Sequence, residues 1–210
     1  MIHDMWQYVM DHREEFTLAI REHVLLSLVS LIAAVLVGVL IGILCAKYDK
    51  LANPIIGVFT FLRLIPSIAL LIVFMPILKT GFMPTAFALT ILALPAICIN
   101  TYSGLTGVDR FAIESATGLG LSKRDIFTKV EFPLAMPLIL VGIRSAFIDV
   151  ISSATLAAIV GGGGLGIYIF RGMMMNDMVK LVLGGISIAV IALLAEVILS
   201  LVQRRYSRFI

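Results

Sequence analysis

Residues 24–46 read VLLSLVSLIAAVLVGVLIGILCA, a run without any charged side chain that ends at Lys47, Asp49 and Lys50. A helix needs about 20 apolar residues to cross roughly 30 Å of hydrocarbon, so this run predicts a membrane-spanning helix. The composition agrees, since 60% of the 210 residues are apolar and 14% are charged. Soluble domains average about 45–50% apolar and about 25% charged residues. A soluble globular fold is therefore excluded.

Four further apolar stretches predict an all-α integral membrane protein, a bundle of five spans. The expected spans cover residues 24–46 and about 51–78, 82–102, 134–159 and 178–202. The second is interrupted by Arg63 and Pro66 and is expected to be one kinked span, because neighbouring helices can satisfy the backbone groups that a proline frees. The glycine run 161–164 ends the fourth span, and residues 165–175 are expected to form a short re-entrant or surface segment.

The basic residues predict the orientation of the bundle. With five spans, the polar segment 109–131, the loop 47–50 and the C-terminus share one side of the membrane. That side carries Lys47, Lys50, Arg110, Lys123, Arg124, Lys129, Arg204, Arg205 and Arg208, against five basic residues on the other. The positive-inside rule therefore predicts a cytoplasmic C-terminus and an N-terminus outside. A sixth span at 150–170 is the alternative, but it would put the basic C-terminus outside.

The chain is expected to divide into three parts. Residues 1–22 are acidic and lack the pattern of a cleaved signal peptide, so they are expected to remain as an extracellular or interfacial segment. An interfacial amphipathic helix and a partly ordered polar leader are both open interpretations for it. Residues 23–203 form the transmembrane domain, and residues 204–210 form a basic cytoplasmic tail.

Several other functions are disfavoured by the residues present. The three histidines all precede the first span without metal-ligand spacing, so no metal site is expected. Gly161, Gly163 and Gly166 fit G-x-G-x-x-G, but they follow a membrane helix rather than a strand, and Ile167 stands where a P-loop requires lysine. The net charge of +3 is small and dispersed, which argues against nucleic-acid binding. No bound cofactor and no enzymatic site are expected on this chain.

The polar segment 109–131 is too charged for the bilayer and too long for a simple turn. Asp109 can cap a short helix there, and Gly118 and Gly120 can stop it. The members of that helix expected on its small-residue face are Phe111, Ala112, Ser115 and Ala116. A short amphipathic helix held between two spans is suited to docking in a groove of another protein.

The same segment resembles the cytoplasmic EAA loop in the membrane subunits of binding-protein-dependent ABC importers. That loop has a glutamate, two alanines, a glycine six positions after the glutamate, and a later hydrophobic-x-Leu-Pro sequence. The matching residues are Glu114, Ala116, Gly120, Val130 and Pro133, whereas Ser115 and Phe132 replace an alanine and the leucine. This resemblance implies a cytoplasmic coupling-helix loop, with coupling residues Glu114, Ser115, Ala116, Gly118, Gly120 and Pro133.

Flanking stretches narrow the resemblance to the osmoprotectant branch, which takes up glycine betaine, carnitine or choline. They are Ile65-Pro66-Ser67, Asn100 to Leu105, Gly142-Ile143-Arg144, and Ala154 to Ala158 before the glycine run. The resemblance covers about residues 20–208. Some family members carry a fused extracellular binding domain after the last span, whereas this chain stops at Ile210. A separate extracellular solute-binding protein is therefore expected.

The resemblance implies a multi-pass permease of the bacterial inner or plasma membrane, surrounded by lipid. Two permeases, identical or homologous, would enclose the pathway, and two cytoplasmic ATPase subunits would bind ATP and Mg. This chain would be a non-catalytic subunit. Glu114 would make a charged contact or a helix-end hydrogen bond, Ala116 would allow close approach, and Gly120 would form the turn. The alternatives are a permease for another small solute such as methionine, or an ATP-independent channel.

Ionisable residues inside expected spans normally face a cavity or a partner, because their exposure to lipid is costly. The candidates for the translocation path or an intramembrane polar role are Arg63, Pro66, Asn100, Arg144 and Asp149. Arg144 can alternatively reach backbone carbonyls of a neighbouring span or Glu196. Arg63 would repel a quaternary ammonium, so it is expected to bond carbonyls near the Pro66 kink or to mark a different solute. The aromatic residues are spread along the chain, and no cage for such a cation is evident.

Overall fold

The apolar runs form long helices, as expected from backbone groups that have no water to bond within hydrocarbon. The computed structural model describes residues 1–207, which contain no strand. Their helices are α1 (Ile2–Asp11), α2 (Arg13–Lys47), α3 (Asp49–Leu62), α4 (Ser67–Leu78), α5 (Phe82–Thr106), α6 (Arg110–Gly118), α7 (Lys123–Ile126), α8 (Phe132–Ala154), α9 (Gly166–Met175) and α10 (Met178–Ser207). A π-helical turn (Phe127–Glu131) joins α7 to α8, and a 3-10 turn (Thr155–Val160) extends α8. Arg208, part of the expected basic tail, lies outside the described residues.

Four helical segments in the described range are long and apolar enough to cross a membrane: α2, α5, the continuous helix from Lys123 to Val160, and α10. The α3–α4 pair supplies a fifth crossing if it counts as one span. The alternative sixth span at 150–170 does not form. The continuous helix that contains α8 ends at Val160, before the glycine run, and the 10 residues of α9 cover only about 15 Å. The all-α membrane fold is confirmed.

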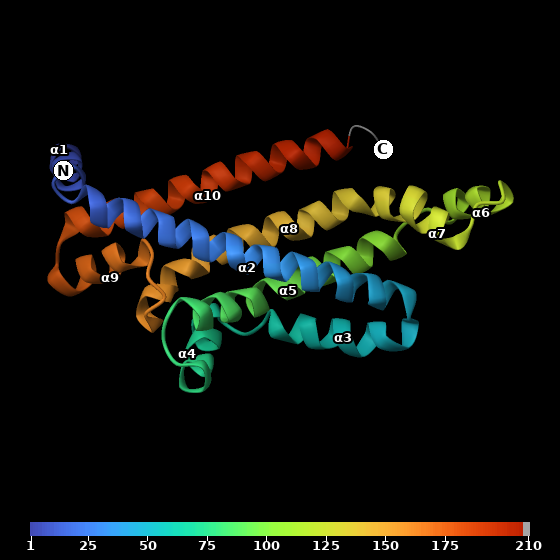
Figure 1. Ribbon diagram of the computed structural model, residues 1–210, viewed down its shortest axis with the longest axis horizontal. Helices are drawn as coiled ribbons and strands as arrows, with labels where there is room; N and C mark the ends of the chain where they lie inside the picture. The colour runs from blue at the N-terminus through green and yellow to red at the C-terminus, as the bar shows by residue number, and fades with distance from the viewer. Residues whose placement is uncertain (208–210) are drawn as a thin grey trace.

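The second expected span differs from the prediction of one kinked helix. α3 ends at Leu62, α4 begins at Ser67, and the two axes are bent by 99°. Pro66 explains the break, because a proline disfavours the helical conformation in the residue before it and has no N–H to donate. In Figure 1, α4 projects away from the direction of the other long helices. Two helices at a sharp angle therefore stand where one kinked span was expected.

Helices α2, α5 and α8 lie side by side along the long axis and form the core (Figure 1). The main cluster of buried apolar side chains joins these three helices and includes Leu26, Leu89, Ile97 and Val150. Ser30 adds a polar tie, since its hydroxyl donates to the Ala86 carbonyl of α5 at 3.1 Å. Small residues and interhelical hydrogen bonds are how helices associate in lipid, where no hydrophobic effect drives them together.

The two ends of the bundle hold different elements. α6 and α7 lie at one end of the long axis, and α1 and α9 lie at the other (Figure 1). The N-terminal segment, for which a helix and a loose leader were both open, is the helix α1. Met5, Tyr8 and Val9 of α1 pack against a cluster that contains Tyr168 and Leu183. α2 starts at Arg13, so the expected boundary between residues 22 and 23 falls within one helix.

Gly42 sets the distance between α2 and α5, and we expect Gly42→Ala to destabilise the protein. A Cβ atom at Gly42 would lie 2.6 Å from Cβ of Thr101 and 2.9 Å from the Cys98 carbonyl oxygen, so the helices would have to move apart. Overpacking of this kind costs about 1–3 kcal/mol. Thermal unfolding of the purified protein in detergent should show a lower midpoint.

Gly57→Ala is the matched control, because a Cβ atom on Gly57 of α3 would meet nothing within 4 Å. It should leave the midpoint unchanged or raise it. An equal loss of stability in both variants would show that general helix effects, and not the α2–α5 distance, are responsible.

Candidate functional site

The polar segment forms a capped helical unit at one end of the bundle. The Asp109 carboxylate accepts a hydrogen bond from the Phe111 N–H at 2.9 Å, as expected for the first residue before a helix. Ser122 caps α7 in the same way, accepting from the Asp125 N–H at 3.2 Å. The Lys129 ammonium, 2.7 Å from Asp125, and the Ser122 hydroxyl hold the pKa of that carboxyl below its ordinary value. The Asp125 carboxylate, which pairs with the Ser122 cap, therefore stays ionised to a lower pH than a free aspartate does.

Gly120 forms the turn that ends α6. The Leu121 N–H donates to the Ala116 carbonyl and the Gly120 N–H donates to the Thr117 carbonyl, the paired bonds of a Schellman motif. Gly120 has φ of +79°, where a side chain would be strained. Gly118, expected to stop the helix, is instead its last residue. The expected turn is present, and only Gly120 needs the conformational freedom of glycine.

Side chains of α6 divide into an outward and an inward set. Glu114 and Ser115 are exposed, and the Glu114 carboxylate lies 3.5 Å from the Arg110 guanidinium. Phe111 and Leu119 are large apolar residues with 77% and 81% of their surface exposed. Ala116, in contrast, is buried against its own chain. This position differs from the expectation that Ala116 allows a partner to approach closely, because its methyl group faces inward.

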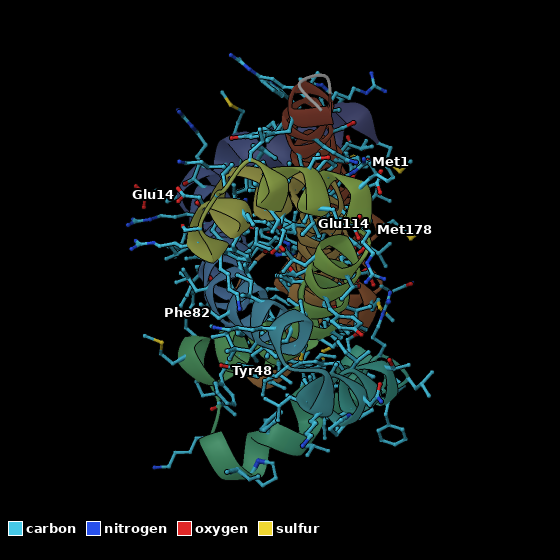
Figure 2. The ribbon with its side chains drawn as sticks, turned by 90° about the vertical axis from the view of Figure 1, so that its right-hand side faces the viewer. Met1, Glu14, Tyr48, Phe82, Glu114 and Met178 are labelled. Carbon is cyan, nitrogen blue, oxygen red and sulfur yellow. The ribbon has the colours of Figure 1, made fainter. Side chains whose placement is uncertain are left out.

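A groove of about 770 Å³ separates α6 and α7 from the ends of the long helices. Its walls are mostly apolar, with Ile43, Ala46 and Leu105 on the bundle side and Ile113 and Phe127 on the side of the polar segment. In Figure 2, which faces this end, the helix that carries Glu114 lies in front of the bundle. The polar segment is therefore a separate unit that touches the bundle through a few residues.

The polar segment is joined to α8 without a break. Pro133 has no N–H to donate to a carbonyl four residues earlier, and a π-helical turn (Phe127–Glu131) precedes it directly. The helix nevertheless runs from Lys123 to Val160, 38 residues or about 57 Å at 1.5 Å per residue. Movement of the polar segment can therefore pass along α8 into the bundle.

Arg144 of α8 is paired with α10. Its Nε donates to Oε2 of Glu196 at 2.9 Å, its Nη2 pairs with Oε1 of the same carboxylate, and its Nη1 donates to Oε1 of Gln203 at 3.1 Å. The expected alternative of a Glu196 partner is thus confirmed. A bidentate arrangement of this kind fixes two helices in register. These contacts give Arg144 a structural role that explains its charge within the span. Its guanidinium is already bonded to Glu196 and Gln203 and is not free to bind a solute.

Asn100 also has a packing role. Its side-chain NH₂ group donates to the Ala96 carbonyl at 2.7 Å, within α5. A Cβ atom on Gly142 would lie 2.7 Å from Cβ of Asn100, so α5 and α8 approach each other closely where these two residues meet. The short distance between the two helices explains why α8 has a glycine here, at position 142, and α5 has a compact polar residue, Asn100.

Arg63 and Asp149 line one cavity of about 260 Å³. The other lining residues are Ser67, Leu92, Ala96 and Ser153. The cavity lies at the break between α3 and α4, against the middle of α5 and the last turns of α8. Among the described residues, the Arg63 side chain donates no hydrogen bond to a carbonyl near Pro66, so the first of its two expected roles is not seen here. Pro66 itself caps α4 beside the cavity.

Comparison with known proteins decides the family. Residues 38–208 match the family model described as "Binding-protein-dependent transport system inner membrane component". The chain belongs to this family. It is therefore a multi-pass membrane subunit of an ABC importer, a class of subunit that does not itself hydrolyse ATP. Such an importer works with ATPase subunits and a solute-binding protein.

Two relatives and one solved structure illustrate the similarity. The permease is 34% identical to the "Choline transport system permease protein OpuBB" of Bacillus subtilis over 97% of this chain and 94% of the relative. It is 38% identical to the "Carnitine transport permease protein OpuCB" of Listeria monocytogenes over 88% of this chain and 84% of the relative. The inward-facing MetNI methionine ABC transporter matches with a TM-score of 0.85 and 19% identity, covering 93% of this chain and 98% of that chain, which shows the shared fold.

One contact of the permease was not foreseen from the sequence. Glu22 is the last residue of the acidic segment 1–22. Its carboxylate accepts a hydrogen bond from the Gly164 N–H at 2.9 Å. His23 beside it is fully buried, and Gly164 packs against it. The glycine loop is thereby tied to α2. No spacing links residues 142 positions apart, so only the fold could reveal this contact.

The Arg144–Glu196 pair gives a stability prediction for the permease. Arg144→Gln would leave the Glu196 carboxylate unpaired between α8 and α10. The pair is only partly buried, so the loss should be smaller than the roughly 3–5 kcal/mol that breaking a fully buried pair costs. We expect a lower unfolding temperature in detergent. The double variant Arg144→Met/Glu196→Leu removes both charges and should recover most of the loss. If the double variant is less stable than either single variant, the pairing energy has been assigned wrongly.

Proposed function

We propose that this chain is the permease subunit of an ATP-driven importer for a quaternary-ammonium osmoprotectant: glycine betaine, carnitine or choline. The supporting observation is similarity at 34–38% identity, over most of the chain, to permeases named for choline and carnitine. The methionine transporter resembles the chain at 19% identity, which speaks for the fold and not for the solute. The family supports an importer over an ATP-independent channel.

The proposed assembly contains two permeases, identical or homologous, two ATPase subunits that bind ATP and Mg, and a separate extracellular receptor. One observation in its favour is the large apolar surface left uncovered by this chain alone. Exposed residues along α10 are Ile186, Val190, Leu193, Leu194, Val197, Ile198 and Leu201. Lipid and a second permease are the two surroundings that suit such a surface.

The proposed orientation puts α1 and α9 outside and α6 and α7 in the cytoplasm. Charge supports this choice, since the α6–α7 end carries Arg110, Lys123, Arg124 and Lys129 in addition to the loop at 47–50. Basic residues are retained in the cytoplasm during insertion. The cytoplasmic end is also where an ATPase subunit would have to bind.

In the proposed mechanism, α6 is the coupling helix. The outward residues Phe111, Glu114 and Ser115 of α6 would contact the ATPase together with Leu119, which directly follows the helix. Ala116 would keep α6 packed against its own chain. Gly120 would hold the turn that follows. Closure of the ATPase subunits would move α6 as a rigid body, and the continuous helix through Pro133 would carry the movement to the cavity beside Asp149. A short capped helix suits this task because it can move without unfolding.

The exposed apolar residue Leu119 gives a test of coupling. Leu119→Ser should reduce solute-stimulated ATP hydrolysis in the reconstituted importer by about tenfold or more, as expected for loss of an apolar anchor at an interface. Tyr206→Ser is the matched control, because Tyr206 is an exposed aromatic at the same end of the molecule but on α10. It should retain activity. Wild-type stimulation in Leu119→Ser would contradict the proposed docking surface.

Cysteine labelling can test the orientation. The two native cysteines, Cys45 and Cys98, are buried and free, so replacing both by alanine gives a suitable background. In that background, an impermeant maleimide should label Met174→Cys in spheroplasts and Tyr48→Cys only in inverted vesicles. Both sites are exposed, so access depends on the side of the membrane. The opposite labelling pattern would invert the proposed topology.

A further inference from the structure

The cavity between Arg63 and Asp149 has features of a solute site. Its volume of about 260 Å³ is close to the lower end of ligand pockets, about 300 Å³, and suits a small molecule. Leu92 and Ala96 give it an apolar wall, and Ser67 and Ser153 give it hydroxyl groups. None of these lining residues is aromatic, so attraction for a cation would have to come from the carboxylate.

The two charges face the same cavity without making a direct pair. Arg63 and Asp149 interact electrostatically, but within the described chain no hydrogen bond or direct ion pair joins them. The contrast is Arg144, which is fully engaged with Glu196 by hydrogen bonds. Arg63 and Asp149 are both exposed where they line this open cavity, so both charges are accessible to an incoming molecule. Ionisable side chains within a membrane span normally face such a cavity or a partner. A molecule with both signs of charge would pair with both at once.

The helix that starts after the break at Pro66 adds positive charge to one side of the cavity. α4 begins at Ser67 on the cavity wall, so the positive end of its helix dipole lies on the same side as the Arg63 guanidinium. Asp149 and Ser153 lie one helical turn apart on α8 and share the other side. The cavity therefore has a positive end on the α3–α4 break and a negative end on α8.

We propose that this cavity binds a compact zwitterion, with its carboxylate at Arg63 and its ammonium group at Asp149. The proposal rests on the proposed function and narrows it. Betaine and carnitine carry both charges, whereas choline carries an ammonium group and a hydroxyl. Choline would leave the Arg63 charge without a counterion and would be repelled by it. The structure thus favours zwitterionic osmoprotectants over choline, although both contain a trimethylammonium group.

This assignment gives Arg63 a role opposite to the one expected from its charge alone. A positive residue would repel a bare cation, and that repulsion rejects choline. The same residue attracts a carboxylate through its positive charge, which a lysine at this position would keep. Glycine betaine and choline share the trimethylammonium end. Selectivity between them would therefore come from the other end, which is a carboxylate in glycine betaine and a hydroxyl in choline.

The experiment uses the complete importer, reconstituted in proteoliposomes with its ATPase subunits and its receptor. ATP-driven uptake of labelled glycine betaine, carnitine and choline is measured for wild type, Arg63→Gln and Arg63→Lys. Wild type should transport a zwitterion more efficiently than choline. Arg63→Gln should lose about tenfold or more of zwitterion uptake, the size expected when a charge-assisted contact is removed, and Arg63→Lys should keep most of it.

Lys79→Gln is the matched control, because Lys79 is another exposed basic residue, at the far end of α4 and outside the cavity. It should transport like wild type. Asp149→Asn should lower uptake of every trimethylammonium solute that wild type transports. Co-purification of the ATPase subunits with each variant shows that the complex still assembles.

Three results would overturn the proposal: choline preferred by wild type, full zwitterion uptake by Arg63→Gln, or equal losses in Arg63→Gln and Arg63→Lys. The last would show that the shape of arginine, and not its charge, matters. Failure of the proposed function would look different, since the wild-type importer would then transport none of the three solutes. In that case the inference that rests on it falls as well.

Discussion

A single constraint shapes this permease: in hydrocarbon, every backbone N–H and C=O group must be bonded within the protein. Because of that requirement the apolar runs form long helices. Each interruption of a helix leaves backbone groups that need another partner. The helices are interrupted at Pro66 and at the glycine run 161–164. At the second site the fold satisfies a freed group with a side chain, since Glu22 accepts from the Gly164 N–H. At the first, the break forms one wall of a polar cavity.

Close helix packing follows from the same constraint. Helices in lipid gain little from burying apolar surface, so they associate through close contact and polar ties. Gly42 against Thr101 and Gly142 against Asn100 provide the contact between neighbouring helices. The Arg144–Glu196 pair ties α10 to α8 where the contact is looser. The core is thus tight enough for α8 to move as one body, which is what the proposed coupling mechanism requires.

The polar segment and the intramembrane cavity lie on one continuous helix. α7, the π-helical turn and α8 extend from Lys123 to Val160, and Asp149 lies near the far end of that length. α6 precedes this helix and is joined to it by the turn at Gly120, so a displacement of α6 by an ATPase subunit would reach the cavity wall through that turn and then along the helix. The two charges lie on different elements, with Arg63 at the break between α3 and α4 and Asp149 on the continuous helix. Relative movement of the two would change the distance between the charges that hold a zwitterion.

Sequence by itself determined the elements that depend on local composition. Charge-free runs predicted most spanning helices, Asp109 predicted a cap, and the spacing from Glu114 to Pro133 indicated the family. Each of these signals is contained in one continuous stretch of the chain. Tertiary structure alone decided what meets across the bundle. It paired Arg144 with Glu196 out of two alternatives, turned Ala116 inward, opened the break at Pro66 to 99°, and brought Arg63 to the same cavity as Asp149. These contacts depend on helix rotation and on bend angles in three dimensions, and one sequence contains no local signal for either.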